Sequence, residues 1–295
     1  MKKIVVKKLL AVTAALLAAV IMLSGCGSVH SETNSGSSGY ANRLEEIKAR
    51  GYITVATEPY FAPNEFIDSS KTGQDQYVGS DIEFAKYIAD KLGVELQIVP
   101  LEFGAVLSSV AEGKYDLAIS ALAYTPARAE SMELSKGYYF SEDDLGYGLV
   151  IREEDLGTIT GPESLADKIV IAQSGSMQEM LTEQYITEYK EFKRVSSTPD
   201  AYLAVTEGKA DAACASIAHA QLYIEANPDC GLAIVPDFEF SVPEEYDGTR
   251  VGAQKGETEL IDFVNTCIDE LLESGQYAEW VEEYKAYAKE LGVTA

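Results

Sequence analysis

The 295-residue sequence is poor in the residue types on which most enzyme and metal sites depend. It holds two histidines, His30 and His219, four cysteines and one tryptophan. No cluster of histidines, cysteines and acids has the spacing of a metal site, and no serine stands in the Gly-x-Ser-x-Gly pattern of a nucleophile elbow. We therefore expect no metal, no cofactor and no catalytic residues.

Basic residues are also few, with 23 lysines and arginines against 48 acids. Because residues 1–25 carry four lysines and no acid, the remaining 270 residues hold 19 basic and 48 acidic side chains, a formal charge of −29. Such a surface repels phosphate, which excludes nucleic acid as a partner and removes any electrostatic attraction to anionic lipid. The acidity could steer cationic solutes toward the protein or simply keep it soluble, and net charge does not choose between these.

Three cysteines remain beside Cys26, which is an odd number for disulfide pairing. Their spacing fits no metal pattern. A bridge between Cys214 and Cys230 is one alternative in an exported protein, and two free thiols are the other. Cys267 lies in an apolar helical stretch, so we expect it in the core.

One long uncharged run, from Leu9 to Leu23, follows four lysines at the N-terminus. It predicts a signal peptide over residues 1–25, and with Ser24, Gly25 and Cys26 it resembles a bacterial lipobox, which implies a lipidated (palmitate-bearing) Cys26. The run is short for a membrane span and lacks the amphipathic face of a buried helix. Residues 26–39 have the composition of a flexible tether. We predict a domain anchored by lipid at the extracytoplasmic face of the cell membrane.

Strand and helix patterns alternate from Tyr52 to Arg128, as in βαβ units. A capping box, Ser80 to Glu83, is expected to open one helix. Thr125 is the expected N-cap of another, with Pro126 at its first position, which places Arg128 in the first turn at the carboxyl end of a strand. The other expected elements are strands at 52–57, 96–98 and 115–120 and a helix at 105–112. Ligands bind at this edge of open α/β sheets.

A second series of the same kind begins after about residue 155. A capping box from Ser176 to Glu179 follows Ser174 and Gly175, and its free backbone N–H groups make a candidate anion site. The remaining expected elements are strands at 168–173 and 210–216, a helix at 200–207, and helices over 259–291 broken near Gly275.

Several motifs resemble, in their order and spacing, the polar amino acid-binding family of ABC-transporter solute-binding proteins. The resemblance implies an α/β, bilobed, periplasmic-binding-protein-like fold with two lobes joined by two crossover strands. It also implies an amino acid enclosed between the lobes and an ABC permease as partner, with membrane contact through the N-terminal lipid only. The motifs are Gly79–Ala85, Gly113–Ile119, Tyr124–Glu130, Tyr138–Phe140, Gln173–Ser176, Gly208–Ala212 and Gly275–Tyr277.

Mapped onto this sequence, the resemblance implies one lobe from residues 40–142 and 237–295 and a second from residues 143–236. Two crossovers would form a hinge. The ligand would then stabilise the closed state, because only there does it touch both lobes.

The same resemblance implies the site residues. Arg128 matches the arginine that holds the ligand carboxylate, a task suited to a guanidinium fork. Phe61 and Phe103 match the positions that sandwich the ligand side chain. The other matched positions are Glu58, an acid facing the ligand; Ser120, Ala121 and Ala123 in the first lobe; and Ser174, Gly175, Ser176 and Ser216 in the second.

Some positions depart from the family pattern. Ala121 and Ala123 replace hydroxyl-bearing residues or glycine, Asn64 replaces an aromatic, and Ser216 stands where relatives place the aspartate that pairs with the ligand ammonium. Since a buried ammonium without a counter-charge is costly, either Glu58 or another acid takes that role, or the ligand is not a standard α-amino acid. With Glu58 in the cleft we expect a cationic or strongly polar ligand side chain rather than an acidic one.

Two other functions are compatible with such a scaffold. An enzyme on the same scaffold, dehydratase-like and acting on a small carboxylic acid, would use a pair such as Glu58 and Glu102 for acid–base work. The sensing domain of a receptor would need an output module beyond a second membrane span. The sequence favours the binding protein over both.

Overall fold

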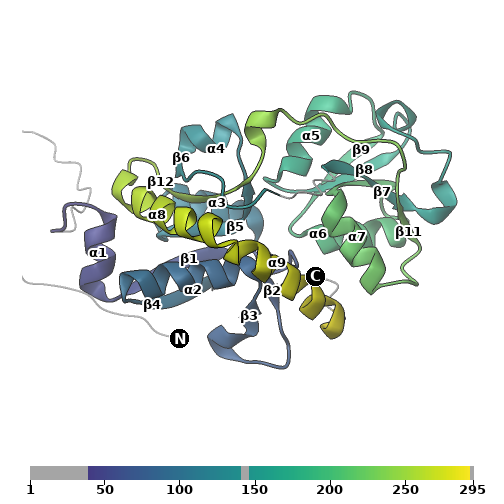
Figure 1. The fold of residues 1–295 in the computed structure, drawn as a ribbon. Helices are drawn as coiled ribbons and strands as arrows, with labels where there is room; N and C mark the ends of the chain where they lie inside the picture. The colour runs from purple at the N-terminus through teal and green to yellow at the C-terminus, as the bar shows by residue number, and fades with distance from the viewer. Residues whose placement is uncertain (1–38, 141–145, 293–295) are drawn as a thin grey trace, which may run out of the picture. The chain divides into compact units, whose positions relative to one another are not determined.

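The computed structural model describes residues 39–140 and 146–292 (Figure 1). The predicted signal peptide, the lipidated Cys26 and nearly all of the tether lie outside these residues. Among the described helices, none has the length and apolar character that a membrane crossing would require.

The first of two five-stranded sheets has the order β4-β1-β5-β12-β6. Its strands are β1 (Tyr52–Thr57), β4 (Glu95–Pro100), β5 (Leu117–Ala123), β6 (Met132–Leu134) and β12 (Thr249–Gln254). β1 runs parallel to β4 and β5, whereas β12 runs antiparallel to β5 and β6. The helices of this part are α1 (Arg43–Arg50), α2 (Ser80–Leu92), α3 (Phe103–Ala111), α4 (Pro126–Ser131), α8 (Thr258–Ser274) and α9 (Gln276–Leu291). We call this sheet and its helices the first lobe.

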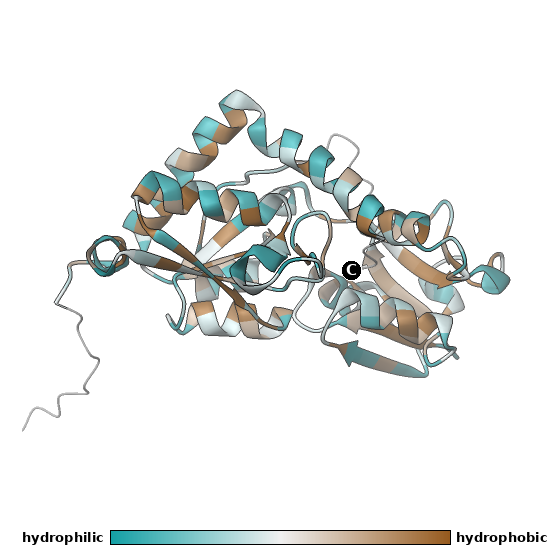
Figure 2. Cartoon of the chain, turned by 90° about the horizontal axis from the view of Figure 1, so that it is seen from below, coloured by the Kyte–Doolittle hydropathy of each residue, from teal (hydrophilic) through white to brown (hydrophobic). Residues whose placement is uncertain are grey.

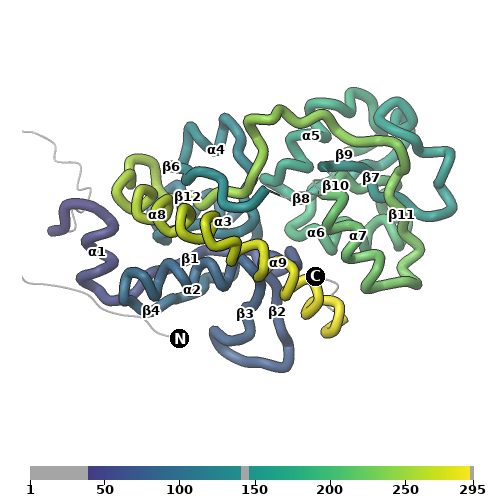
Figure 3. Tube along the Cα trace, in the orientation of Figure 1, coloured from purple at the N-terminus to yellow at the C-terminus, as the bar shows by residue number. Residues whose placement is uncertain are grey.

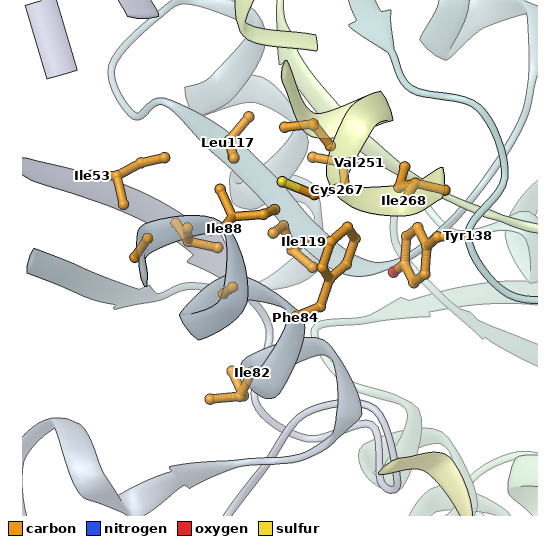
Figure 4. Packing of buried hydrophobic residues seen from close by; sticks show 14 of the residues in the cluster. Ile53, Ile82, Phe84, Ile88, Leu117, Ile119, Tyr138, Val251, Cys267 and Ile268 are labelled. Atoms are coloured by element: carbon orange, nitrogen blue, oxygen red, sulfur yellow. The ribbon is translucent and has the colours of Figure 1, made fainter. Parts of the chain in front are cut away.

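The two faces of this sheet belong to separate hydrophobic clusters, because successive strand residues point to opposite faces. Val55 packs on the side of α2, α8 and α9, whereas its neighbour Ala56 packs on the side of α3. On the larger side Ile82, Ala85, Ile88 and Ala89 of α2 are buried, and Cys267, expected in the core, lies in the same cluster (Figure 4). Apolar and polar residues alternate along the covering helices (Figure 2).

The second sheet has the order β11-β7-β10-β8-β9. Its strands are β7 (Tyr147–Arg152), β8 (Ile169–Gln173), β9 (Glu191–Val195), β10 (Ala212–Ser216) and β11 (Leu232–Ile234), and its helices are α5 (Met177–Tyr185), α6 (Thr198–Thr206) and α7 (Ile217–Ala226). One face packs on α5, and the other on α6 and α7. We call this part the second lobe. Cys214 and Cys230 within it are free thiols, so the bridge between them is not formed.

Two connections join the lobes, one between β6 and β7 and one between β11 and β12 (Figure 3). They meet at Thr249, whose N–H donates to Tyr139 O over 3.1 Å and whose carbonyl accepts from Tyr138 N over 2.9 Å. This is the bilobed α/β fold expected from the sequence. The lobe boundaries at 142/143 and 236/237 stay predictions.

The short remaining elements are the hairpin β2 (Phe66–Ile67) and β3 (Tyr77–Val78) and four 3₁₀ turns. These turns are η1 (Gly73–Gln76), η2 (Glu153–Asp155), η3 (Pro162–Ser164) and η4 (Glu244–Tyr246).

The capping box predicted at Ser80 is wrong. Gly79 is the N-cap of α2, and the Ser80 hydroxyl lies 3.1 Å from the Tyr277 hydroxyl instead of capping the helix. Gly79 has φ 130°, and a Cβ there would lie 2.1 Å from Asn64 O, so only glycine fits. A distant tertiary hydrogen bond has replaced the local one.

The other two predicted N-caps are present. Thr125 Oγ1 accepts from Arg128 N over 3.1 Å, with Pro126 first in α4. Ser176 Oγ likewise accepts from Glu179 N over 3.1 Å, but the Glu179 carboxylate accepts from Gly175 N rather than closing the box on Ser176. Two helix starts differ slightly, since α3 begins at Phe103 and α6 at Thr198.

Candidate functional site

A cavity of about 570 Å³ is lined by residues of both lobes. Of the eleven predicted ligand-binding residues, nine lie on its wall: Glu58, Phe61, Phe103, Ser120, Ala121, Ala123, Arg128, Ser176 and Ser216. Ser174 and Gly175 do not line it. Ser174 donates its N–H to Val195 O and continues the β8–β9 pairing, while Gly175 reaches the site only through a contact to Arg128.

Arg128 places a buried positive charge in this cavity. Its Nη1 donates to Ala123 O over 2.7 Å, its Nη2 donates to Gly175 O over 2.9 Å, and its guanidinium carbon lies 5.3 Å from the centre of the Phe103 ring. Burial lowers the pKa of Arg128 to about 10, so the group stays protonated at neutral pH. The first turn of α4, fixed by the Thr125 cap, carries it to the edge of β5.

The two predicted sandwich residues differ from each other in their packing. Phe103 is 8% exposed and belongs to the cluster under α3, so it is a core residue as well as a wall residue. Phe61 is half-buried, and its ring stacks on the imidazole of His219 with 3.6 Å between centroids. One face of Phe61 is therefore covered by His219 in this structure.

His219 is a wall residue to which the sequence analysis assigned no role. Its Nδ1 lies 2.9 Å from Ser216 Oγ, and its Nε2 lies 3.1 Å from Asn64 Oδ1 in the first lobe. Because an amide oxygen only accepts, Nε2 carries the proton and Nδ1 accepts from Ser216. Burial, followed by the charge of Lys285, lowers the pKa of His219 to about 3, so the ring is neutral. The sequence did hold a signal, since Asn64 and Ser216, two departures from the family pattern, are the partners of this one imidazole.

Two buried glutamates line the same cavity. Burial raises the pKa of Glu58 to about 8, with Asp200 adding to the shift and a hydrogen bond from Gln173 opposing it. Glu65, which the sequence reading missed, accepts from Ser120 Oγ over 2.8 Å. Burial and then the charge of Asp81 hold the pKa of Glu65 well above its usual range.

Asp81 on α2 is a buried acceptor of hydrogen bonds from several elements around the cavity. Its carboxylate accepts from Ala121 N over 2.7 Å, from the Tyr138 hydroxyl over 2.8 Å and from the Tyr277 hydroxyl over 2.5 Å. Burial outweighs these bonds and raises the pKa of Asp81. Ala121 has φ 45°, a backbone conformation that favours glycine, and the bond to Asp81 helps to hold it there. Residues of β5, a lobe connection and α9 thus meet at one carboxylate.

Other predicted chemistry is not assembled on this wall. Glu102 is exposed and does not line the cavity, so the structure does not bring Glu58 and Glu102 together as an acid–base pair. Within residues 39–140 and 146–292, no three histidines, cysteines or acids are grouped so as to hold a metal ion.

Comparison with known proteins gives a consistent result. Residues 53–287 match the family described as bacterial extracellular solute-binding proteins, family 3. The arginine-binding extracellular protein ArtP of Bacillus subtilis (strain 168) is 27% identical over 258 residues, which cover 86% of this chain and 89% of ArtP. The histidine-binding periplasmic protein of Escherichia coli (strain K12) is 26% identical, with 79% of this chain and 86% of the relative covered.

A solved structure agrees with these relatives. The amino acid ABC transporter substrate-binding protein AbpA from Streptococcus pneumoniae Canada MDR_19A, bound to L-arginine, is 33% identical to this chain. It superposes with a TM-score of 0.73 over 84% of this chain and 99% of AbpA.

Proposed function

The chain belongs to family 3 of the bacterial extracellular solute-binding proteins, and we propose that it is the substrate-binding lipoprotein of an amino acid ABC importer. The two lobes close around an amino acid and deliver it to a membrane permease. The proposal includes export by the signal peptide of residues 1–25 and attachment to the outer face of the membrane through a lipid on Cys26.

One observation carries the proposal: a buried, protonated Arg128 lies on the wall of a cavity between two lobes. A guanidinium has five N–H donors in a planar fork that fits a carboxylate. The partners of Nη1 and Nη2 here are main-chain carbonyls, which supply no counter-charge. A ligand carboxylate would supply it, and the N-terminus of α5, capped by Ser176 on the same wall, would add favourable backbone dipoles.

The class of amino acid follows from two buried acids that line the same cavity as this arginine. Glu58 and Glu65 are buried on the same wall, and neither forms an ion pair with a lysine or arginine of the described residues. An ammonium or guanidinium on the ligand would favour the ionised form of these carboxyls and be attracted to it, whereas a carboxylate side chain would oppose that ionisation. The arginine- and histidine-binding relatives and the arginine-bound AbpA structure support the same preference.

A thermal-shift screen of the purified protein against the twenty amino acids tests this function. A ligand at a hundredfold its Kd adds about 2.7 kcal/mol to the free energy of unfolding. We expect arginine, lysine or histidine to raise the melting temperature most, and glutamate and aspartate to leave it unchanged. Failure of every amino acid to raise it would overturn the proposal.

A further inference from the structure

The imidazole of His219 joins the two lobes. His219 belongs to α7 of the second lobe, and its Nε2–H donates to Asn64 Oδ1 of the first lobe over 3.1 Å. Its ring also stacks on Phe61 of the first lobe, with 3.6 Å between the ring centroids and 17° between the ring planes. One side chain therefore makes both a directed hydrogen bond and a ring contact between the lobes.

The imidazole is held in this orientation by its own lobe. Its Nδ1 accepts from Ser216 Oγ over 2.9 Å, and Ser216 is the N-cap residue of the same helix. A neutral imidazole carries one proton, so a hydroxyl that donates to Nδ1 leaves the proton on Nε2. The second lobe thus presents an oriented N–H donor to the first.

The acceptor in the first lobe is also held in place. Asn64 is 5% exposed, and its Nδ2 donates to the Tyr277 hydroxyl over 3.2 Å. Its main-chain carbonyl accepts from Asp81 N over 2.9 Å. The bond to Tyr277 orients the amide so that Oδ1, which only accepts, faces His219. Because donor and acceptor are both oriented in advance, their bond costs little side-chain entropy.

This contact lies at the ligand cavity. Phe61 and His219 both line the cavity of about 570 Å³. They also line a second hollow of about 20 Å³, which has room for about one water molecule. The lobes therefore meet here with little space between them. The other residues around this hollow come from both lobes and are mostly aromatic or aliphatic: Tyr60, Ala62, Thr198, Tyr202, Leu222 and Tyr223.

Other contacts between the lobes are of different kinds. Lys289 on α9 forms an ion pair with Glu225 on α7, but these side chains are 52% and 59% exposed, and an exposed ion pair contributes little stability. Arg128 also reaches the second lobe, at Gly175 O, but the proposed function assigns Arg128 to the ligand. The contact of His219 is uncharged, partly buried and made entirely between protein groups.

We propose that His219 is a positioning residue for lobe closure, which stabilises the closed arrangement through Asn64 and Phe61. The inference rests on the proposed function, in which an amino acid is bound between closed lobes. It adds a residue that acts on binding through the arrangement of the lobes, and it gives a common role to Asn64 and Ser216, two departures from the family pattern.

A role in closure has a distinct effect on affinity. The apparent affinity for a ligand is the intrinsic affinity multiplied by the fraction of molecules in the binding-competent arrangement. That fraction is the same for every ligand. His219 should therefore change how tightly amino acids bind, but not which of them is preferred.

Two substitutions of His219 test the proposal. His219→Ala removes both the bond to Asn64 and the ring contact with Phe61, whereas His219→Phe keeps a ring against Phe61 and removes the N–H donor. Isothermal titration calorimetry at pH 7 gives the affinity of each variant for L-arginine, L-lysine and L-histidine. We expect His219→Ala to weaken binding of each amino acid that the native protein binds by the same factor, about threefold to tenfold. His219→Phe should lose less.

Small-angle X-ray scattering measures closure itself. Without amino acid, His219→Ala should have a larger radius of gyration than the native protein, because fewer molecules have closed lobes. A saturating concentration of whichever of the three amino acids binds most tightly should bring both proteins to the same radius. The matched control Leu203→Ala truncates an exposed side chain of the second lobe that lines neither hollow, and it should change neither affinity nor radius.

The outcomes separate the two proposals. Native affinity and a native radius of gyration in both His219 variants would overturn the role of His219 and leave amino acid binding intact. A loss of affinity confined to one amino acid, with an unchanged radius, would also overturn it, since it would place His219 in contact with that ligand.

Binding of no amino acid by the native protein would overturn the proposed function. The radius of gyration of the ligand-free variants would still decide whether His219 holds the lobes together. If His219→Ala does not fold, His219→Phe, which keeps an aromatic ring at this position, gives the same comparison with the native protein.

Discussion

Arg128 Nη2 donates to the carbonyl of Gly175 over 2.9 Å, which joins the first turn of α4 in one lobe to the loop before α5 in the other. The guanidinium is thus oriented before any ligand arrives, by main-chain groups whose positions do not depend on side-chain rotamers. In the proposed complex, a ligand carboxylate would bind the guanidinium N–H groups that the Ala123 and Gly175 carbonyls leave available. Pre-orientation of the guanidinium lowers the entropic cost of such binding.

Replacing Arg128 by alanine should abolish amino acid binding. Loss of a charge-assisted bidentate contact costs about 3 kcal/mol or more, which corresponds to about a hundredfold in Kd. The protein itself should stay folded, because the side chain bonds only main-chain carbonyls. Calorimetry with arginine and thermal unfolding without it measure the two effects, and native-like affinity in Arg128→Ala would remove this residue from the site.

The two phenylalanines should respond differently to alanine substitution. Phe61→Ala is expected to weaken ligand binding by about tenfold or more with a small change in the stability of the empty protein. Phe103→Ala should weaken binding too, but it also leaves a cavity under α3 and should cost about 3 kcal/mol or more of unfolding free energy. Urea unfolding of both variants without ligand checks this, and equal stability losses would contradict it.

Glu58 should make the empty protein less stable as the solution becomes more alkaline. Its pKa is raised from 4.5 to about 8, so its contribution is fully present below pH 4.5 and is lost as pH rises through 8. Above pH 6.5, where the unfolded histidine is neutral, we expect the unfolding free energy to fall by about 1–2 kcal/mol up to pH 8. Glu58→Gln, which mimics the protonated form, should show a shallower fall in urea unfolding, and an identical pH profile would refute the assignment.

His219 acts in the opposite direction and in a lower pH range. Its pKa is lowered from 6.5 to about 3, so its contribution is present above pH 6.5 and is lost as pH falls through 3. Between pH 6.5 and 5 the protein should lose stability through this residue, and His219→Gln should remove that part of the pH dependence. Urea unfolding of His219→Gln and of the native protein across this pH range tests the prediction. An identical pH dependence of the two proteins would contradict it.

The lipid anchor can be tested separately from binding. In cells, Cys26→Ala should move the protein from the membrane fraction to the soluble fraction, because the side chain that would carry the lipid is gone. Amino acid binding by the purified variant should be unchanged. A variant that stays with the membrane would show that attachment does not depend on this cysteine.

Local sequence signals predicted those parts of the site whose geometry is local. The Thr125 cap and Pro126 fix the first turn of α4, so the position of Arg128 could be read from neighbouring residues. Ser80 shows the limit, because its expected cap was replaced by a contact with Tyr277, 197 positions away. A capping preference is worth about 1 kcal/mol, which a buried tertiary bond can outweigh.

The missed residues all depend on such distant partners. Glu65 is bonded to Ser120 of β5, and Asp81 is bonded to Tyr138 of a lobe connection and to Tyr277 of α9. All three partners are distant in sequence. His219 had no assigned role because its contact with Asn64 spans 155 positions. The spacing of residues along the chain does not predict these pairings. The departures from the family pattern at Asn64 and Ser216 did indicate the region in which His219 lies.

The strand order of the first sheet has a consequence for how the protein is made. β12, near the end of the chain, pairs with both β5 and β6, so the first sheet cannot be completed until residue 254 has joined it. The second sheet uses one continuous stretch and is complete at Ile234. A chain that crosses a membrane from its N-terminus would therefore deliver a finished second sheet while the first still lacks β12 and Tyr277, one of the two tyrosines that donate to Asp81. If the chain is exported as proposed, the pocket would form only after translocation is nearly complete, and the chain would not bind amino acids before it has crossed the membrane.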